Sequence, residues 1–156
     1  METSRREMLV AGTVLTAALA AGAQAQEGGK PGSMPGSMEV IHVYADADGV
    51  SHYQRVQVTG LPKPMPAGKV AANAIAPGGG GWHTAPMKLF TINTAGDIIA
   101  EFSDGTKVSI GKGDLVYLED LTGKGHITRL LNEVANLFIQ MPDDFDFLTW
   151  AGAQPE

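Results

Sequence analysis

The sequence predicts an all-β domain folded as an antiparallel meander or barrel. The 156 residues include 20 Gly and 9 Pro but few aromatic residues, a composition typical of many turns and short strands rather than a helical bundle. Runs of β-forming residues are separated by tight turns rich in Gly and Asp, at 94–97, 103–106 and 111–114. With 44% hydrophobic residues, the chain can bury one core, and a small barrel encloses room for about one ligand.

Residues 1–25 predict an export signal. Arg5 and Arg6 precede an uncharged apolar run and resemble a twin-arginine (Tat) signal, and the pattern Ala-Gln-Ala that ends at Ala25 fits signal cleavage. We therefore expect a periplasmic or secreted protein. The alternative is a retained membrane anchor, because residues 8–26 carry no charge. The cleavage pattern favours removal, so no stable membrane anchoring is expected afterwards.

Composition excludes several classes of function. The net charge is −6, and it stays at −6 when the signal takes away two Arg and two Glu. An acidic surface disfavours nucleic acid as a partner and offers no basic patch to anionic lipid. The chain has no cysteine, which excludes disulfides, thiolate metal sites and Cys nucleophiles. A metal would have to bind His, carboxylate or water.

Residues 26–38 predict a flexible linker, because a Gly, Pro and Ser composition with two copies of Pro-Gly-Ser-Met cannot bury enough apolar surface to order itself. The folded domain is expected at residues 39–142, with a glycine hinge at 77–81. Asp46 and Asp48 before Gly49 indicate a hairpin turn rather than a calcium loop, since the other oxygen ligands are missing. The expected strands are 40–44, 51–58, 70–76, 88–93, 97–102, 107–110, 115–118, 126–131 and 136–141.

An acidic aromatic tail occupies residues 143–156. Its apolar side chains are expected to cap one end of the barrel or to pack against a second subunit. Asp143 or Asp144 is expected to cap a short helix. The strand at 40–44 is expected to be an edge that needs cover, which favours a homodimer.

Two histidines, His83 and His126, stand at opposite ends of a β-rich segment and are expected to point into one pocket. Their surroundings, Trp82-His83-Thr84-Ala85-Pro86 and Glu119-Asp-Leu-Thr-Gly-Lys-Gly-His126, resemble motifs of small single-domain bacterial cupins of the RmlC-like superfamily. This resemblance implies a cupin-type antiparallel β-barrel, or jelly roll, that binds a small molecule.

The resemblance also implies a metal site, but this chain lacks part of it. Where cupins carry their second histidine and their glutamate, this chain has Ala85 and Leu89, although the family glycine is present at Gly96. A divalent metal held by His83 and His126 would need a third ligand. The candidates for it are Glu119, Asp120, His42 and His52.

Three alternatives remain open for the histidines. They hold a weakly bound metal, they act without metal as general acid and base, or they are structural residues of a barrel that only binds a ligand. The candidate catalytic residues are His83, His126 and Glu119, and the candidate ligand-binding residues are Trp82, Tyr117, Asp120 and Lys124.

These alternatives correspond to two functions. One is an enzyme of isomerase, lyase or oxygenase type that acts on a small organic molecule. The other is a non-catalytic module that binds a small molecule or a partner. Lys124 is expected to pair with Glu119 or Asp120, and no P-loop or serine-nucleophile motif is present.

Overall fold

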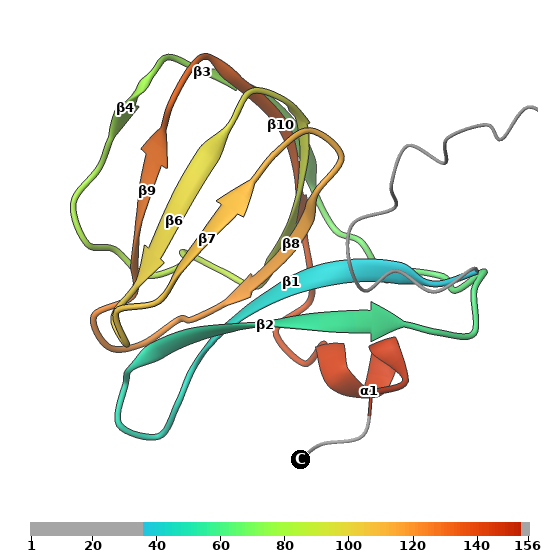
Figure 1. Cartoon of the computed structure of the whole chain (residues 1–156). Coiled ribbons are helices and arrows are strands. Elements are labelled where there is room, and N and C mark those ends of the chain that lie inside the picture. The colour runs from blue at the N-terminus through green and yellow to red at the C-terminus, as the bar shows by residue number, and fades with distance from the viewer. Residues whose placement is uncertain (1–35, 154–156) are drawn as a thin grey trace, which may run out of the picture.

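The computed structural model describes residues 36–153 of the chain, which contain ten strands and one short helix (Figure 1). The predicted signal peptide at 1–25 lies outside the described residues, as does most of the linker, so both stay predictions. The first strand begins at Met38, one residue before the expected start of the domain. The elements are β1 Met38–Ala45, β2 Ser51–Val58, β3 Val70–Ile75, β4 Gly78–Gly79, β5 Leu89–Ala95, β6 Ile98–Phe102, β7 Lys107–Ile110, β8 Leu115–Glu119, β9 His126–Leu130, β10 Val134–Gln140 and α1 Phe147–Ala151.

The strands form two sheets that face each other. The larger sheet has the order β2-β1-β8-β5-β10-β3, and the smaller has the order β4-β9-β6-β7 (Figure 1). The predicted fold class, an all-β protein of the barrel or jelly-roll type, is confirmed. The expected strands match those observed to within two residues. The predicted glycine hinge at 77–81 is wrong, because Gly78 and Gly79 form the short strand β4, which pairs with β9.

Strand β1 differs from the prediction in two ways. It pairs in parallel with β8, so the barrel is not wholly antiparallel. A tight turn forces consecutive strands to be antiparallel, but β1 and β8 are far apart in sequence and no turn fixes their relative direction. β1 also lies between β2 and β8, so residues 40–44 are not an edge strand. The edge argument for a homodimer therefore fails at this strand, and the homodimer stays a prediction.

The six-stranded sheet buries apolar side chains on both faces. Neighbouring residues on a strand point to opposite faces, so Val116 packs between the two sheets while Tyr117 packs on the outside. We call the two sets the inner and outer clusters. The inner cluster is Ile41, Val43, Ile98, Ala100, Phe102, Val108, Ile110, Val116 and Val134. The outer cluster is Val40, Val56, Val58, Phe90, Tyr117, Met141, Phe145, Phe147 and Ala151.

The C-terminal tail covers the outer face of the six-stranded sheet. α1 lies beneath β1 and β2 (Figure 1), and the ring of Phe147 stacks on that of Tyr117 with centroids 4.7 Å apart. The helix N-cap is Asp146, whose side chain accepts a hydrogen bond from the backbone of Thr149, so the prediction of Asp143 or Asp144 is wrong. Among residues 36–153, no helix is long and apolar enough to span a membrane.

The turn between β1 and β2 is joined by His52 to the turn between β6 and β7. Asp46 accepts hydrogen bonds from the backbone of Asp48 and Val50, which is the predicted turn chemistry. The Nε2 atom of His52 lies 2.8 Å from Asp46, and its Nδ1 atom lies 2.9 Å from Asp104. Only a protonated imidazole donates from both nitrogens. The hydrogen bond to Asp46 therefore raises the pKa of His52 above its usual value.

The raised pKa of His52 makes the stability of this link depend on pH. A group whose pKa is higher in the folded state stabilises the fold below its unfolded pKa, near 6.5, and that stability is lost as the pH rises through the folded pKa. We expect the Tm of the wild type to fall above about pH 6.5. The Tm of the His52→Gln variant should depend less on pH over this range. Parallel curves for the two proteins would contradict the assignment.

Candidate functional site

His83 and His126 lie side by side, but only His83 lines the cavity between the two sheets, so the expectation that both point into one pocket is met by His83 alone. Their backbones form an isolated β-bridge, in which the amide of His83 donates to the carbonyl of His126 at 3.0 Å and the reverse bond is 2.8 Å. Their ring centroids are 4.5 Å apart. The loop before β5 and the start of β9 thus bring two imidazoles together from distant parts of the sequence.

One nitrogen of each imidazole has a fixed partner. The Nδ1 atom of His126 lies 2.6 Å from the carboxylate of Asp120, which is completely buried. The Nδ1 atom of His83 lies 2.9 Å from the carbonyl of Gly81 and must carry the hydrogen, since a carbonyl only accepts. In the neutral rings, the Nε2 atoms of both histidines are therefore the free proton acceptors.

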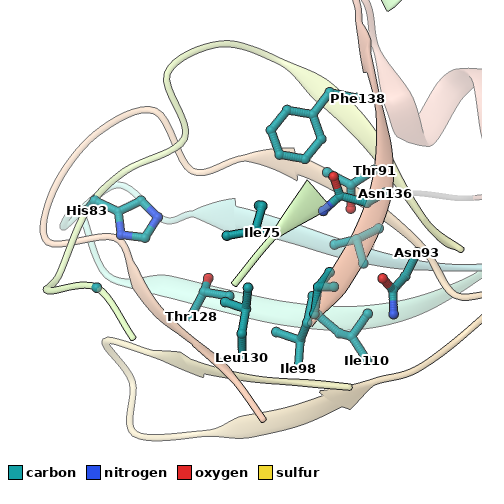
Figure 2. A pocket seen from close by; sticks show the side chains of 13 residues that line it. Ile75, His83, Thr91, Asn93, Ile98, Ile110, Thr128, Leu130, Asn136 and Phe138 are labelled. Atoms are coloured by element: carbon teal, nitrogen blue, oxygen red, sulfur yellow. The ribbon is translucent and has the colours of Figure 1, made fainter. Parts of the chain in front are cut away.

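A cavity of about 300 Å³ lies between the two sheets, with His83, an exposed residue, at one end (Figure 2). His126 precedes Thr128 by two residues on β9, and strand alternation places both side chains on the same face. The cavity wall is largely apolar, and no Lys, Arg, Asp or Glu belongs to it. The lining residues are Ile75, Gly80, His83, Thr91, Asn93, Ile98, Ile110, Val116, Thr128, Leu130, Val134, Asn136 and Phe138.

Glu119 and Tyr117 do not join the histidine pair, and their predicted place in the pocket is wrong. Glu119 accepts a hydrogen bond from the hydroxyl of Tyr117 at 3.4 Å, and it lies 2.6 Å from the Nε2 atom of His42, on the outer face of the six-stranded sheet. Because Glu119 and Asp120 are adjacent, only Asp120 reaches His126. Burial, together with the charge of Glu119, raises the pKa of Tyr117 well above its usual value. These residues support the packing of α1.

Lys124 does not pair with Glu119 or Asp120 as predicted. Its ammonium nitrogen lies 3.8 Å from the centroid of the Trp82 ring, a cation–π contact between two residues that flank the histidine bridge. The carboxylate of Asp120 is hydrogen-bonded to His126, and Lys124 instead contacts the aromatic face of Trp82. Trp82 is partly exposed and does not line the cavity, so it is not the ligand-binding residue of this pocket that the sequence predicts.

The residues present do not fit a firmly held metal ion. Within the described part of the chain, no three His, Cys, Asp or Glu side chains are close enough together to bind one. His42 is bonded to Glu119 and His52 to two aspartates, so neither supplies the third ligand. Leu89 shares a face of β5 with Thr91, but it offers no donor atom. Two imidazoles are fewer ligands than even catalytic zinc sites use.

Sequence reasoning missed the polar residues at the inner end of the cavity. Asn93 and Asn136 lie in the predicted strands 88–93 and 136–141, and both side chains point into the cavity. Asparagine is depleted in strands, so a strand asparagine that alternates with apolar residues is the signal that could have found them. Both are buried, with exposed fractions of 2% and 7%.

Comparisons with known proteins define neither a family nor a function. No protein-family model and no curated protein matches the chain. One similar solved structure is protein NMB1881 from Neisseria meningitidis, with 22% sequence identity, a TM-score of 0.39, and coverage of 47% of this chain and 72% of that chain. Another is a protein from Salmonella typhimurium provisionally named ethanolamine utilization protein Q, with 13% identity, a TM-score of 0.39, and coverage of 69% and 98%. The function must therefore be argued from the side chains of this chain.

Proposed function

We propose that this chain is an exported cupin-type protein that binds a small organic molecule between its two sheets, and that the histidine pair transfers a proton to or from that molecule. The observation that carries the proposal is the buried Asp120–His126 hydrogen bond, whose imidazole lies next to His83, the histidine that lines the cavity. Cavities of this kind, with few convergent polar groups, are the usual form of small-molecule sites. Export rests on the predicted signal at residues 1–25.

The hydrogen-bond geometry assigns the roles. His126 accepts a proton at its Nε2 atom, and the carboxylate of Asp120 stabilises the imidazolium that forms. The ring of His83 lies next to that of His126, with centroids 4.5 Å apart. His83, the more exposed of the pair, can then return a proton or exchange it with solvent. This arrangement suits a proton-shifting isomerase or lyase.

The second candidate is a binding module without catalysis. It is favoured by the aliphatic Ala85 and Leu89, which stand where the resembling cupins carry ligating side chains. In this case the histidines only shape the mouth of the cavity.

A screen followed by deuterium exchange separates the two functions. Compounds that raise the Tm of the wild type, but not of a cavity-filling Leu130→Trp variant, are expected to be ligands of the cavity. In D₂O, catalysis predicts that NMR detects deuterium entering a carbon-bound position of such a ligand. His126→Ala should slow this entry by about 100-fold or more.

Variants of the two histidines and of Leu130 also define the results that would contradict each function. If His83→Ala and His126→Ala keep both ligand binding and the wild-type rate of deuterium entry, catalysis by the histidine pair is excluded and the binding module remains. If no compound distinguishes the wild type from Leu130→Trp, small-molecule binding in the cavity is excluded as well.

A further inference from the structure

Three asparagines form a row across neighbouring strands of the larger sheet. Asn136 on β10 lies opposite Asn73 on β3 and opposite Asn93 on β5. Residues directly opposite each other in antiparallel strands present their side chains on the same face. Asn73 also precedes Ile75, a residue of the cavity wall, by two positions on β3. The row therefore faces the interior, and we call it the asparagine row.

Each member of the asparagine row has a buried amide atom without a hydrogen-bond partner in the described structure. These atoms are Nδ2 of Asn73, Oδ1 of Asn93 and Oδ1 of Asn136. The orientation of the Asn93 amide is fixed, because its Nδ2 atom donates to the carbonyl of Gly96 at 2.8 Å. Its Oδ1 atom is therefore a true unpaired acceptor. Buried polar groups are nearly always paired in proteins, so three unpaired atoms in one row call for a partner.

The row and the histidine pair lie at opposite ends of the cavity. Figure 2 shows His83 at one end and Asn93 and Asn136 at the other, with Ile75 and Leu130 between them. The row offers one donor and two acceptors, and the cavity wall carries no Lys, Arg, Asp or Glu. A ligand must thus bring its own hydrogen-bond donor and acceptor, and an uncharged ligand loses less solvation on entering.

We propose that the asparagine row recognises the polar end of an uncharged amide-type ligand, a carboxamide or a lactam. The N–H of the ligand donates to Oδ1 of Asn136, and its carbonyl accepts from Nδ2 of Asn73, which lies directly opposite Asn136. The rest of the ligand packs on the aliphatic wall, with its far end toward His83. The volume of about 300 Å³ is at the lower limit for ligand sites and suits a molecule with one ring. This inference rests on the proposed small-molecule binding.

Matched probes test the proposal in solution. Benzamide is compared with acetophenone, and 2-piperidone with cyclohexanone, because each ketone keeps the ring and the carbonyl but lacks the N–H. Calorimetric titration should show at least one amide binding about tenfold tighter than its ketone, since the ketone leaves a buried acceptor unpaired. Benzoate, the charged analogue of benzamide, should bind more weakly than benzamide.

Variants test whether the preference for amides over ketones arises from the asparagine row. Asn136→Leu, or Asn136→Ala if the first does not fold, should reduce the amide preference to less than about twofold, because an acceptor is lost. Thr128→Val is the matched control: it removes one hydroxyl from the wall at another strand and should keep the full preference. The Oδ1 atom of Asn136 has no hydrogen-bond partner within the described residues, and the backbone pairing of Asn136 does not depend on its side chain, so the substitution changes recognition rather than a structural bond.

Each remaining result overturns the inference. Equal binding of amides and ketones excludes the row as the recognition element, and an amide preference that survives both Asn136 variants excludes the assigned hydrogen bond to Asn136. Benzoate binding as tight as benzamide excludes the uncharged class. If amides and ketones bind equally but both lose binding in Leu130→Trp, the inference fails while the proposed binding function stands. If no probe binds the wild type, the inference fails, and the compound screen decides the proposed function.

Discussion

Gly125→Ala is expected to destabilise the fold by about 3 kcal/mol or more and to displace His83 from His126. Gly125 has a positive φ of 75°, which side chains with a Cβ rarely adopt. A Cβ there would overlap the backbone carbonyl of His83 and lie 2.8 Å from the nitrogen of Thr84. The strand bridge that joins the two histidines would have to open. Urea denaturation measures the loss of stability.

Gly105→Ala is the matched control for this prediction. Gly105 also has a positive φ, 88°, but a Cβ at this position would meet no atom within 4 Å. Gly105→Ala should therefore lose only about 1 to 2 kcal/mol of stability, which is the conformational cost of a Cβ at positive φ. The difference between the two variants measures the contact between Gly125 and His83. Equal losses would show that this contact is not tight and that the bridge tolerates a side chain.

The sequence was sufficient to predict the strands, because each strand is a local pattern ended by Gly, Asp or Pro. Long-range pairing was harder to predict. Val40 and Ile41 are both buried, on opposite faces of β1, which is the pattern of an interior strand covered on both faces. The prediction of an edge strand at 40–44 is wrong because it disregards this pattern. The parallel pairing of β1 with β8 has no local signal at all, since no turn connects the two strands.

The candidate site was predicted in part. The two motifs correctly paired His83 with His126, and alternation correctly separated Glu119 from Asp120. The face of each could not be assigned, because both faces of β8 are buried and neither carboxylate is marked as the solvent side. The face of Tyr117, on the same strand, could not be assigned for the same reason. The asparagine row depends on the register between three strands, and that register is visible only in the fold.

Asp120→Ala is expected to cost about 3 kcal/mol or more, because it leaves the buried Nδ1 atom of His126 without a partner. Asp120→Asn should cost less, about 1 kcal/mol, since the amide oxygen can still accept the hydrogen of Nδ1. Under the proposed function, however, Asp120→Asn should slow deuterium entry into a cavity ligand by about 100-fold, because a neutral amide does not stabilise the imidazolium. Urea denaturation and NMR measure the two effects.

The separation of stability from proton transfer is what distinguishes a catalytic Asp120 from a structural one. Asp143→Asn, at an exposed carboxylate in the tail, should change neither quantity, with a stability effect within about 0.5 kcal/mol. If Asp120→Asn keeps wild-type deuterium entry, the carboxylate only positions the ring of His126, and proton transfer does not need its charge. If Asp120→Ala costs no more stability than Asp143→Asn, the hydrogen bond to His126 contributes nothing to the fold, and the assignment of this pair as the centre of the site is wrong.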